Sequence, residues 1–177
     1  MRDGKLLLCA LALLAARSVL AADDPCAGFT WNVAHERAVF ATAPIAVTAA
    51  TKPGPAPVLE PDHLYVVTLS PQDQVAFAMA PAKKALADGA FAGLLHLHVP
   101  AAGKYRVSMD NGFWIDVIAD GRFAPTDDFT GQRECRAPRK IVQYPLPAGS
   151  DLTLQFSGAN SSTVHVTLTA APAPAPK

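Results

Sequence analysis

Alternating apolar and polar residues dominate the chain from about residue 64 onward. The clearest case is Leu95, Leu97 and Val99, which alternate with His96 and His98. Successive side chains of a strand point to opposite faces of a sheet, so this period of two predicts a half-buried strand. Alternation or short apolar runs predict further strands over residues 64–69, 75–79, 105–109, 113–118, 141–144, 152–156 and 164–168.

Turn signals separate these segments at intervals of roughly ten residues. The pairs Asn111 with Gly112 and Asp120 with Gly121 are typical of tight hairpins. Residues 52–58 are proline-rich and predict a loop, because proline cannot donate to a strand ladder. Together the strands and turns predict an all-β fold, an antiparallel, jelly-roll-like sandwich of about eight strands.

The region before residue 52 has a different pattern. Residues 34–40 are the best candidate for a helix, a short one near the start of the domain, and residues 45–47 for a strand. Residues 81–89 predict a loop or a single helical turn, and residues 124–138 predict a long polar loop. We place the β-sandwich domain at residues 22–170 and expect a disordered tail rich in proline and alanine at 171–177.

Residues 1–21 have the pattern of a secretion signal. Arg2 and Lys5 give a positive start, residues 6–16 are apolar without interruption, and small residues lead to Ala21. The apolar run is about half the roughly 20 residues that span a bilayer. We therefore expect an exported protein, periplasmic or extracellular, that does not span the membrane after cleavage. Cleavage after Ala22 and an uncleaved anchor are the alternatives.

Composition narrows the classes of partner. The chain is neutral overall, with 16 prolines and 11 glycines. Residues 1–21 hold three basic residues and one acidic residue, so the remainder carries a net charge of −2. Without a basic face the sequence predicts no binding to nucleic acid. The partner classes left open are a protein and a carbohydrate.

Two cysteines follow the predicted signal, Cys26 and Cys135. An even count in an oxidising compartment favours one disulfide. It would close a loop of about 110 residues, for which chain-entropy models give ~4–5 kcal/mol. A reactive thiol pair is the alternative, but the Cys-x-x-Cys spacing of redox motifs is absent.

Two segments of the sequence resemble those of a known domain family. Residues 99–121 and 146–168 each begin with a turn containing proline, alanine and glycine that leads into an alternating strand. They resemble the small jelly-roll domains that follow secreted bacterial peptidases, the prepeptidase C-terminal type. The resemblance covers less than half of the mature chain and implies an accessory or binding role outside the cell. This chain departs from the pattern in having no attached protease and fewer aspartates than the calcium-binding members.

His96 and His98 are the sharpest candidate for metal chemistry, because residues i and i+2 of a strand project from one face. Cupins, which include iron-dependent dioxygenases, carry such a His-x-His pair with a glycine before it and a glutamate after it. Here Gly89 lies upstream and no glutamate follows directly. A third ligand for a transition metal would have to come from His35, His63, His165 or Glu36. The alternative is a solvent-facing pair without metal.

Calcium is the second metal to consider. Asp116, Asp120, Asp127 and Asp128 loosely resemble a calcium loop, although the third position counted from Asp116 is Ile118, which offers no side-chain oxygen. An ordinary hairpin turn at Asp120 is the alternative.

Aromatic residues offer a different kind of site. Trp31, Trp114, Tyr105 and Tyr144 are candidates for a platform that binds sugar or peptide, or for core residues. Trp114 follows Phe113 in a predicted strand, so the two face opposite ways.

Catalytic motifs are absent from the sequence: there is no Gly-x-Ser-x-Gly elbow and no phosphate-binding glycine loop. The first hypothesis is therefore an exported, non-enzymatic binding or accessory module with no cofactor. The alternatives are a small metal-dependent, dioxygenase-type enzyme centred on His96 and His98, and a structural protein of the cell envelope.

Overall fold

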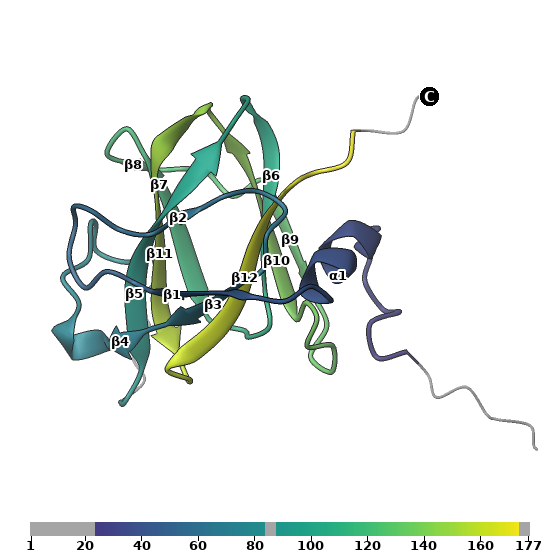
Figure 1. The fold of residues 1–177 in the computed structure, drawn as a ribbon, viewed down its shortest axis with the longest axis horizontal. Coiled ribbons are helices and arrows are strands. Elements are labelled where there is room, and N and C mark those ends of the chain that lie inside the picture. The colour runs from purple at the N-terminus through teal and green to yellow at the C-terminus, as the bar shows by residue number, and fades with distance from the viewer. Residues whose placement is uncertain (1–23, 84–87, 174–177) are drawn as a thin grey trace, which may run out of the picture.

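The computed structural model describes residues 24–83 and 88–173. The secretion signal predicted for residues 1–21 and the last four residues of the predicted tail lie outside the described residues. Two β-sheets lie face to face, and one short helix packs outside them (Figure 1). The predicted all-β sandwich is confirmed.

The first sheet contains six strands, and the second contains five in its hydrogen-bonded path plus one that pairs to the side. The first sheet has the order β1 (Ile45–Thr48), β3 (Tyr65–Thr68), β12 (Thr163–Ala170), β6 (Gly103–Met109), β10 (Lys140–Leu146) and β9 (Asp128–Gly131). The second has the order β2 (Val58–Leu59), β5 (Phe91–Val99), β11 (Gly149–Ala159), β7 (Trp114–Ala119) and β8 (Arg122–Phe123), with β4 (Ser70–Pro71) on β5. A single 3₁₀ turn, η1 (Gln72–Gln74), follows β4.

The strands exceed the predicted eight because several are very short. Strands β2, β4 and β8 have two residues each, and β9 lies inside the stretch predicted as a polar loop. Two pairings among the described strands, β1 with β3 and β2 with β5, are parallel rather than antiparallel. Parallel neighbours need a crossover connection. Here the chain supplies it by leaving β1 for the second sheet and returning to β3.

The core lies between the inner faces of the two sheets. Leu95, Leu97 and Val99 of β5 and the alternate residues Val107 and Met109 of β6 are fully buried in it. The period-two prediction for these strands is therefore confirmed. The intervening His96 and His98 are only partly buried on the other face of β5.

The two predicted hairpin turns have different outcomes. Asp120 and Gly121 have positive φ angles of 51° and 69°, and they join β7 to β8 in a two-residue hairpin. Asn111 and Gly112 do not form a hairpin, because they connect β6 of the first sheet to β7 of the second. Both sides of β6 are already paired, with β10 and β12, so the chain must cross to the other sheet.

Residues 75–79 form no strand, contrary to the prediction. The buried side chain of Gln155 takes the place of a strand partner for this segment. Its Oε1 accepts hydrogen bonds from the amides of Ala78 (3.0 Å) and Met79 (3.4 Å), and its Nε2 donates to the Met79 carbonyl at 3.0 Å. A side chain from β11 thereby satisfies backbone groups that a ladder would otherwise pair.

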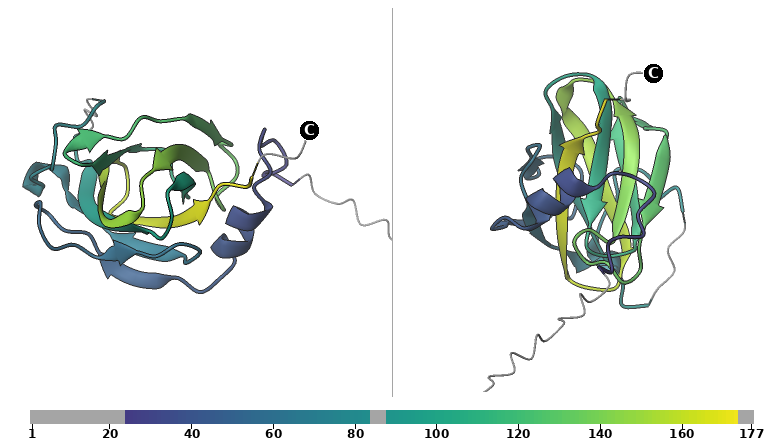
Figure 2. Two further views of the ribbon diagram at one scale, coloured as in Figure 1. Left: turned by 90° about the horizontal axis from the view of Figure 1, so that it is seen from above. Right: turned by 90° about the vertical axis from the view of Figure 1, so that its right-hand side faces the viewer.

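The predicted helix is confirmed as α1 (Ala34–Phe40). Val33, Glu36 and Val39 recur at helical spacing on its buried side. This side faces the outer surface of the first sheet, where α1 packs beside β12 (Figure 2). None of the helices in the described part of the chain is long and apolar enough to cross a membrane.

The predicted disulfide is present. Cys26 and Cys135, 109 residues apart, are joined by an S–S bond of 2.00 Å. Cys135 is fully buried. The bond fastens the segment before α1 to the loop between β9 and β10. Gln132 of that loop adds a hydrogen bond to the Gly28 carbonyl.

Candidate ligand-binding pocket

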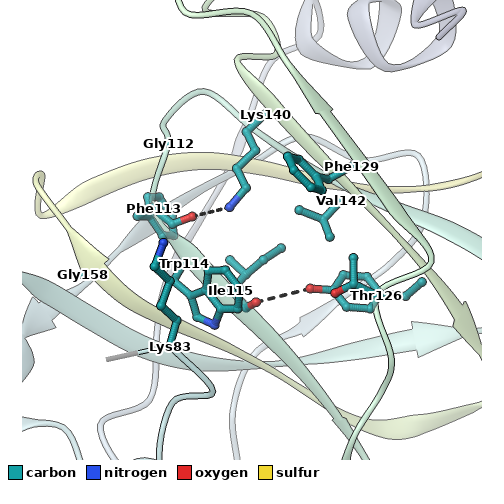
Figure 3. A pocket seen from close by; sticks show the side chains of 11 residues that line it. Lys83, Gly112, Phe113, Trp114, Ile115, Thr126, Phe129, Lys140, Val142 and Gly158 are labelled. Atoms are coloured by element: carbon teal, nitrogen blue, oxygen red, sulfur yellow. Dashed lines mark hydrogen bonds between the residues drawn. The ribbon is translucent and has the colours of Figure 1, made fainter. Parts of the chain in front are cut away.

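A pocket of about 560 Å³ lies where the two sheets part. The second sheet contributes Trp114 and Ile115 of β7. The first sheet contributes Phe129 of β9 and Val142 and Tyr144 of β10. We call this the Trp114 pocket, and Figure 3 shows its side chains from close by. Its volume lies within the roughly 300–1,000 Å³ of ordinary small-molecule sites.

A hydrogen bond to Asp116 fixes the position of the Trp114 side chain. Its Nε1 donates to Asp116 Oδ1 at 2.9 Å, and Asp116 Oδ2 accepts from the Ala82 amide at 3.2 Å. Asp116 is buried, so its carboxylate is committed to these two donors and is turned away from solvent. The ring of Trp114 itself is only partly buried and forms part of the pocket wall.

Two lysines reach the same ring from different parts of the chain. Lys83 Nζ lies 5.5 Å from the Trp114 ring centroid, and Lys140 Nζ lies 5.6 Å from it. Both distances are within the range of cation–π attraction. Lys140 also donates a hydrogen bond of 2.7 Å to the Phe113 carbonyl, drawn as a dashed line in Figure 3.

The buried position of Lys140 makes the charged form of its side chain energetically unfavourable. Burial lowers the pKa of the Lys140 ammonium below its ordinary value, and the nearby charge of Lys83 lowers it further. The Asp116 carboxylate raises it in part. None of the ion pairs formed within residues 24–83 and 88–173 includes either lysine.

Tyr144 closes the floor of the pocket. Its hydroxyl donates to the Ile115 carbonyl at 3.3 Å, across from one sheet to the other. Burial raises the pKa of the Tyr144 phenol well above its ordinary value. The ring is therefore neutral across the physiological range and acts as an apolar surface with one satisfied polar end.

Phe129 forms the rim, and it is the most exposed large hydrophobic residue in the described part of the chain, at 68% of its full accessibility. Phe129 and Lys140 also line a second cavity of about 280 Å³, together with Arg133 and Arg139. The sequence reasoning did not single out Phe129, Lys83 or Lys140. The signal for Phe129 was present as an isolated aromatic residue within a polar stretch.

The four aromatic residues singled out by sequence go to different places. Trp114 and Tyr144 meet in the pocket. Tyr105 is buried in the core, and its hydroxyl donates to the Ala101 carbonyl at 3.0 Å. Trp31 lies before α1 and packs on the Arg106 guanidinium, 4.6 Å from ring centroid to Cζ.

Arg106 links Trp31 to a buried ion pair. Its Nη1 donates to Glu36 Oε1 at 2.9 Å and to the Asn32 carbonyl at 3.0 Å. Glu36 is 1% exposed, and Thr169 also donates to its Oε1. We call Trp31, Glu36 and Arg106 the Trp31 cluster. Its contacts join α1 to the first sheet.

His96 and His98 project from β5 and bind different partners. His96 Nε2 lies 3.0 Å from the Gly54 carbonyl in the proline-rich loop. His98 Nδ1 lies 2.5 Å from Glu60 Oε2. The strand thus places both on one face, as predicted, and each imidazole is held by a separate segment.

The residues considered as a third metal ligand also have other partners. His35 pairs with Asp62 at 2.7 Å, and His165 with Asp110 at 2.8 Å. His63 Nδ1 lies 2.9 Å from the Pro61 carbonyl. Within the described residues no three His, Cys, Asp or Glu side chains gather as a metal-binding group.

The four aspartates proposed for calcium are likewise dispersed. Asp116 lies beneath Trp114, and Asp120 forms the β7–β8 turn. Asp127 binds Lys104 at 2.8 Å and Gln143 at 2.7 Å, and these bonds lower the pKa of its carboxyl. Asp128 Oδ1 accepts from the Phe129 amide.

No family model, no curated protein and no solved structure matches this chain. The resemblance to prepeptidase C-terminal domains stays a prediction.

Proposed function

We propose that this protein is an exported, non-enzymatic β-sandwich module that binds its ligand in the Trp114 pocket. The observation that carries the proposal is the convergence of Trp114, Phe129 and Tyr144 on one concave, largely apolar space with two lysines beside it. Large apolar pockets that hold a few placed polar groups are the usual form of ligand sites.

The exposed ring of Phe129 supports a binding role. Exposure of a large aromatic side chain to water is unfavourable, and its burial against a ligand would be favourable. On β9 it stands at the edge of the first sheet, beside the opening of the pocket. A ligand seated in the pocket would cover it together with the exposed part of Trp114.

The polar groups of the pocket suit binding better than turnover. Its titratable side chains are the two lysines and Tyr144, whose phenol is neutral at physiological pH. The disulfide and the predicted signal support a location in an oxidising compartment outside the cytoplasm. The family resemblance in residues 99–121 and 146–168 supports an accessory role there.

The test is a binding screen read by amide chemical shifts. The ¹⁵N-labelled protein is exposed to pools of oligosaccharides, of short peptides and of small organic acids. We expect at least one pool to shift amides of Trp114, Phe129 and Lys140 together. Trp114→Ala and Phe129→Ala should each weaken the response about tenfold or more.

Ile45→Ala provides the matched control. Ile45 is also an exposed large hydrophobic residue, 44% accessible, but it stands on β1 at the other edge of the first sheet. This change should leave binding intact. Shifts that map to another face, or a ligand consumed during the titration, would contradict the proposal. If no pool shifts the amide signals of the pocket, the structural envelope role would be favoured instead.

A further inference from the structure

We infer that the ligand of the Trp114 pocket is a small amphipathic carboxylate. Its acidic group would lie between Lys83 and Lys140, and its apolar body would lie against Trp114 and Phe129. This inference rests on the proposed function and narrows it from ligands in general to one chemical class.

The first argument is the hydrogen-bonding capacity of the two amines. An ammonium group has three donors, and Lys140 uses one of them on the Phe113 carbonyl. Both Nζ atoms lie within 5.6 Å of the Trp114 centroid. Figure 3 shows the two side chains running toward the segment formed by Phe113 and Trp114. A carboxylate has two oxygens and can accept from both amines at once.

The second argument is electrostatic. Two like charges beside one ring repel each other, and burial of Lys140 strengthens that repulsion by reducing the screening of water. The carboxylate nearest to them, Asp116, already accepts from Trp114 and Ala82. An anion from outside would neutralise both lysines and would restore the hydrogen bonds that Lys140 loses on leaving water.

The third argument concerns the rest of the ligand. Apart from the two lysines and Thr126, the side chains of the walls are aromatic or aliphatic, such as Phe129, Val142 and Tyr144, and the Tyr144 hydroxyl is already bound. A neutral sugar with many hydroxyls would find few partners here. A planar or aliphatic body would instead bury apolar area, which is favourable in proportion to that area.

An acidic peptide is the main competitor, because Arg133 and Arg139 line the neighbouring cavity beyond Phe129. The Trp114 pocket favours the small ligand, since both of its amines lie within 5.6 Å of the centroid of one ring. An extended peptide would need charges spaced along its length.

The experiment compares two probes that share a phenylpropyl body and differ in the end group, a carboxylate in phenylbutyrate and a neutral hydroxymethyl group in phenylbutanol. Each is titrated calorimetrically into the wild-type protein and the double variant Lys83→Gln with Lys140→Gln. The exposed Lys52→Gln is the matched control. Lys140→Arg keeps the charge and tests whether charge, rather than lysine, is needed. Thermal unfolding of each variant checks that it is folded.

We expect phenylbutyrate to bind at least about tenfold more tightly than phenylbutanol, a difference of one decade in Kd. That preference should disappear in the double glutamine variant, persist in Lys52→Gln and Lys140→Arg, and shrink as salt is added.

Three results would overturn the inference in distinguishable ways. Equal binding of both probes, insensitive to the lysines but lost in Trp114→Ala, leaves the pocket as a ligand site and removes the carboxylate. No binding of either probe, together with a silent pool screen, removes the proposed function as well. Binding of a peptide ending in phenylalanine, with no binding of phenylbutyrate, assigns the site to a peptide.

Discussion

The two tryptophans of this chain both pack against cations and both line a cavity, but among the described residues only the cation at Trp31 is paired with a carboxylate of the protein. At Trp31 a single guanidinium, Arg106, covers the ring, and its charge is matched by the buried carboxylate of Glu36. At Trp114 two ammonium groups meet beside one ring, and the nearby carboxylate, Asp116, is occupied by other donors. Neither lysine enters an ion pair with another described residue.

This difference separates a structural contact from a binding site. A buried charge that has its counter-charge and its hydrogen bonds inside the protein fixes the position of two elements. A pair of like charges facing an open apolar pocket has its best counter-charge outside the protein. The Trp31 cluster should therefore govern stability and the Trp114 pocket should govern binding.

The largest expected effect is a loss of stability at the Trp31 cluster. Glu36→Ala leaves the Arg106 guanidinium, whose side chain is 9% exposed, buried without its counter-charge. Breaking such a pair costs about 3–5 kcal/mol of unfolding free energy. Urea denaturation measures the loss. Binding of a pocket ligand to the folded variant should be unchanged.

Glu60→Ala is the control for that measurement. Glu60 pairs with His98 at 2.5 Å, but both side chains are about half exposed. Exposed pairs contribute less than about 1 kcal/mol. Equal losses in the two variants would contradict the structural role of the Trp31 cluster.

The disulfide sharpens the comparison further, because it fastens the segment that carries Trp31. Replacing Cys26 and Cys135 by serine should lower the unfolding free energy by about 2–5 kcal/mol, chiefly because the unfolded chain is no longer constrained by the crosslink and gains conformational entropy. Denaturant titration of the double variant checks this. A ligand affinity that fell in parallel would show that the two regions are not independent.

A smaller effect is expected at the Trp114 pocket, where Lys140 makes the stability of the protein depend on pH. Since the pKa of Lys140 is lowered in the folded state, the unfolded chain binds more protons between that pKa and the ordinary value near 10.5. The contribution of Lys140 to stability therefore rises with pH through this window, while its penalty is fully present below it. Lys140→Met removes the charge, so the variant's stability relative to wild type should be greatest at pH 7 and should decline toward pH 10.

Paired unfolding measurements at several pH values test this directly. Lys52→Met, an exposed lysine, should give a difference that does not vary with pH. A flat difference for Lys140→Met as well would mean that its ammonium is not desolvated in the folded protein.

The sequence predicted local features well because burial imposes a local pattern. Leu95, Leu97 and Val99 alternate because one face of β5 packs into the core. The Asp120 and Gly121 turn is read correctly because its positive φ angles favour those residues. The disulfide was predicted from the two cysteines that follow the expected signal and from the oxidising compartment which that signal implies.

What the sequence did not predict depends on partners far along the chain. Whether Asn111 and Gly112 form a hairpin depends on β10 and β12, which occupy both sides of β6. Residues 75–79 are apolar like a strand, but Gln155 binds their backbone from β11. The sequence predicted only part of the pocket lining, because Trp114 and Tyr144 were among the residues expected to form an aromatic platform. Lys83, Phe129 and Lys140 come from segments that only the fold brings together.

The most direct test of the central claim uses the two indole N–H groups as reporters in a single ¹H–¹⁵N spectrum. Trp31→Phe removes one of the two signals and so assigns both. On titration with phenylbutyrate, the account predicts that the Trp114 signal shifts to saturation while the Trp31 signal stays in place. A shift of the Trp31 signal, or no shift of the Trp114 signal, would contradict it.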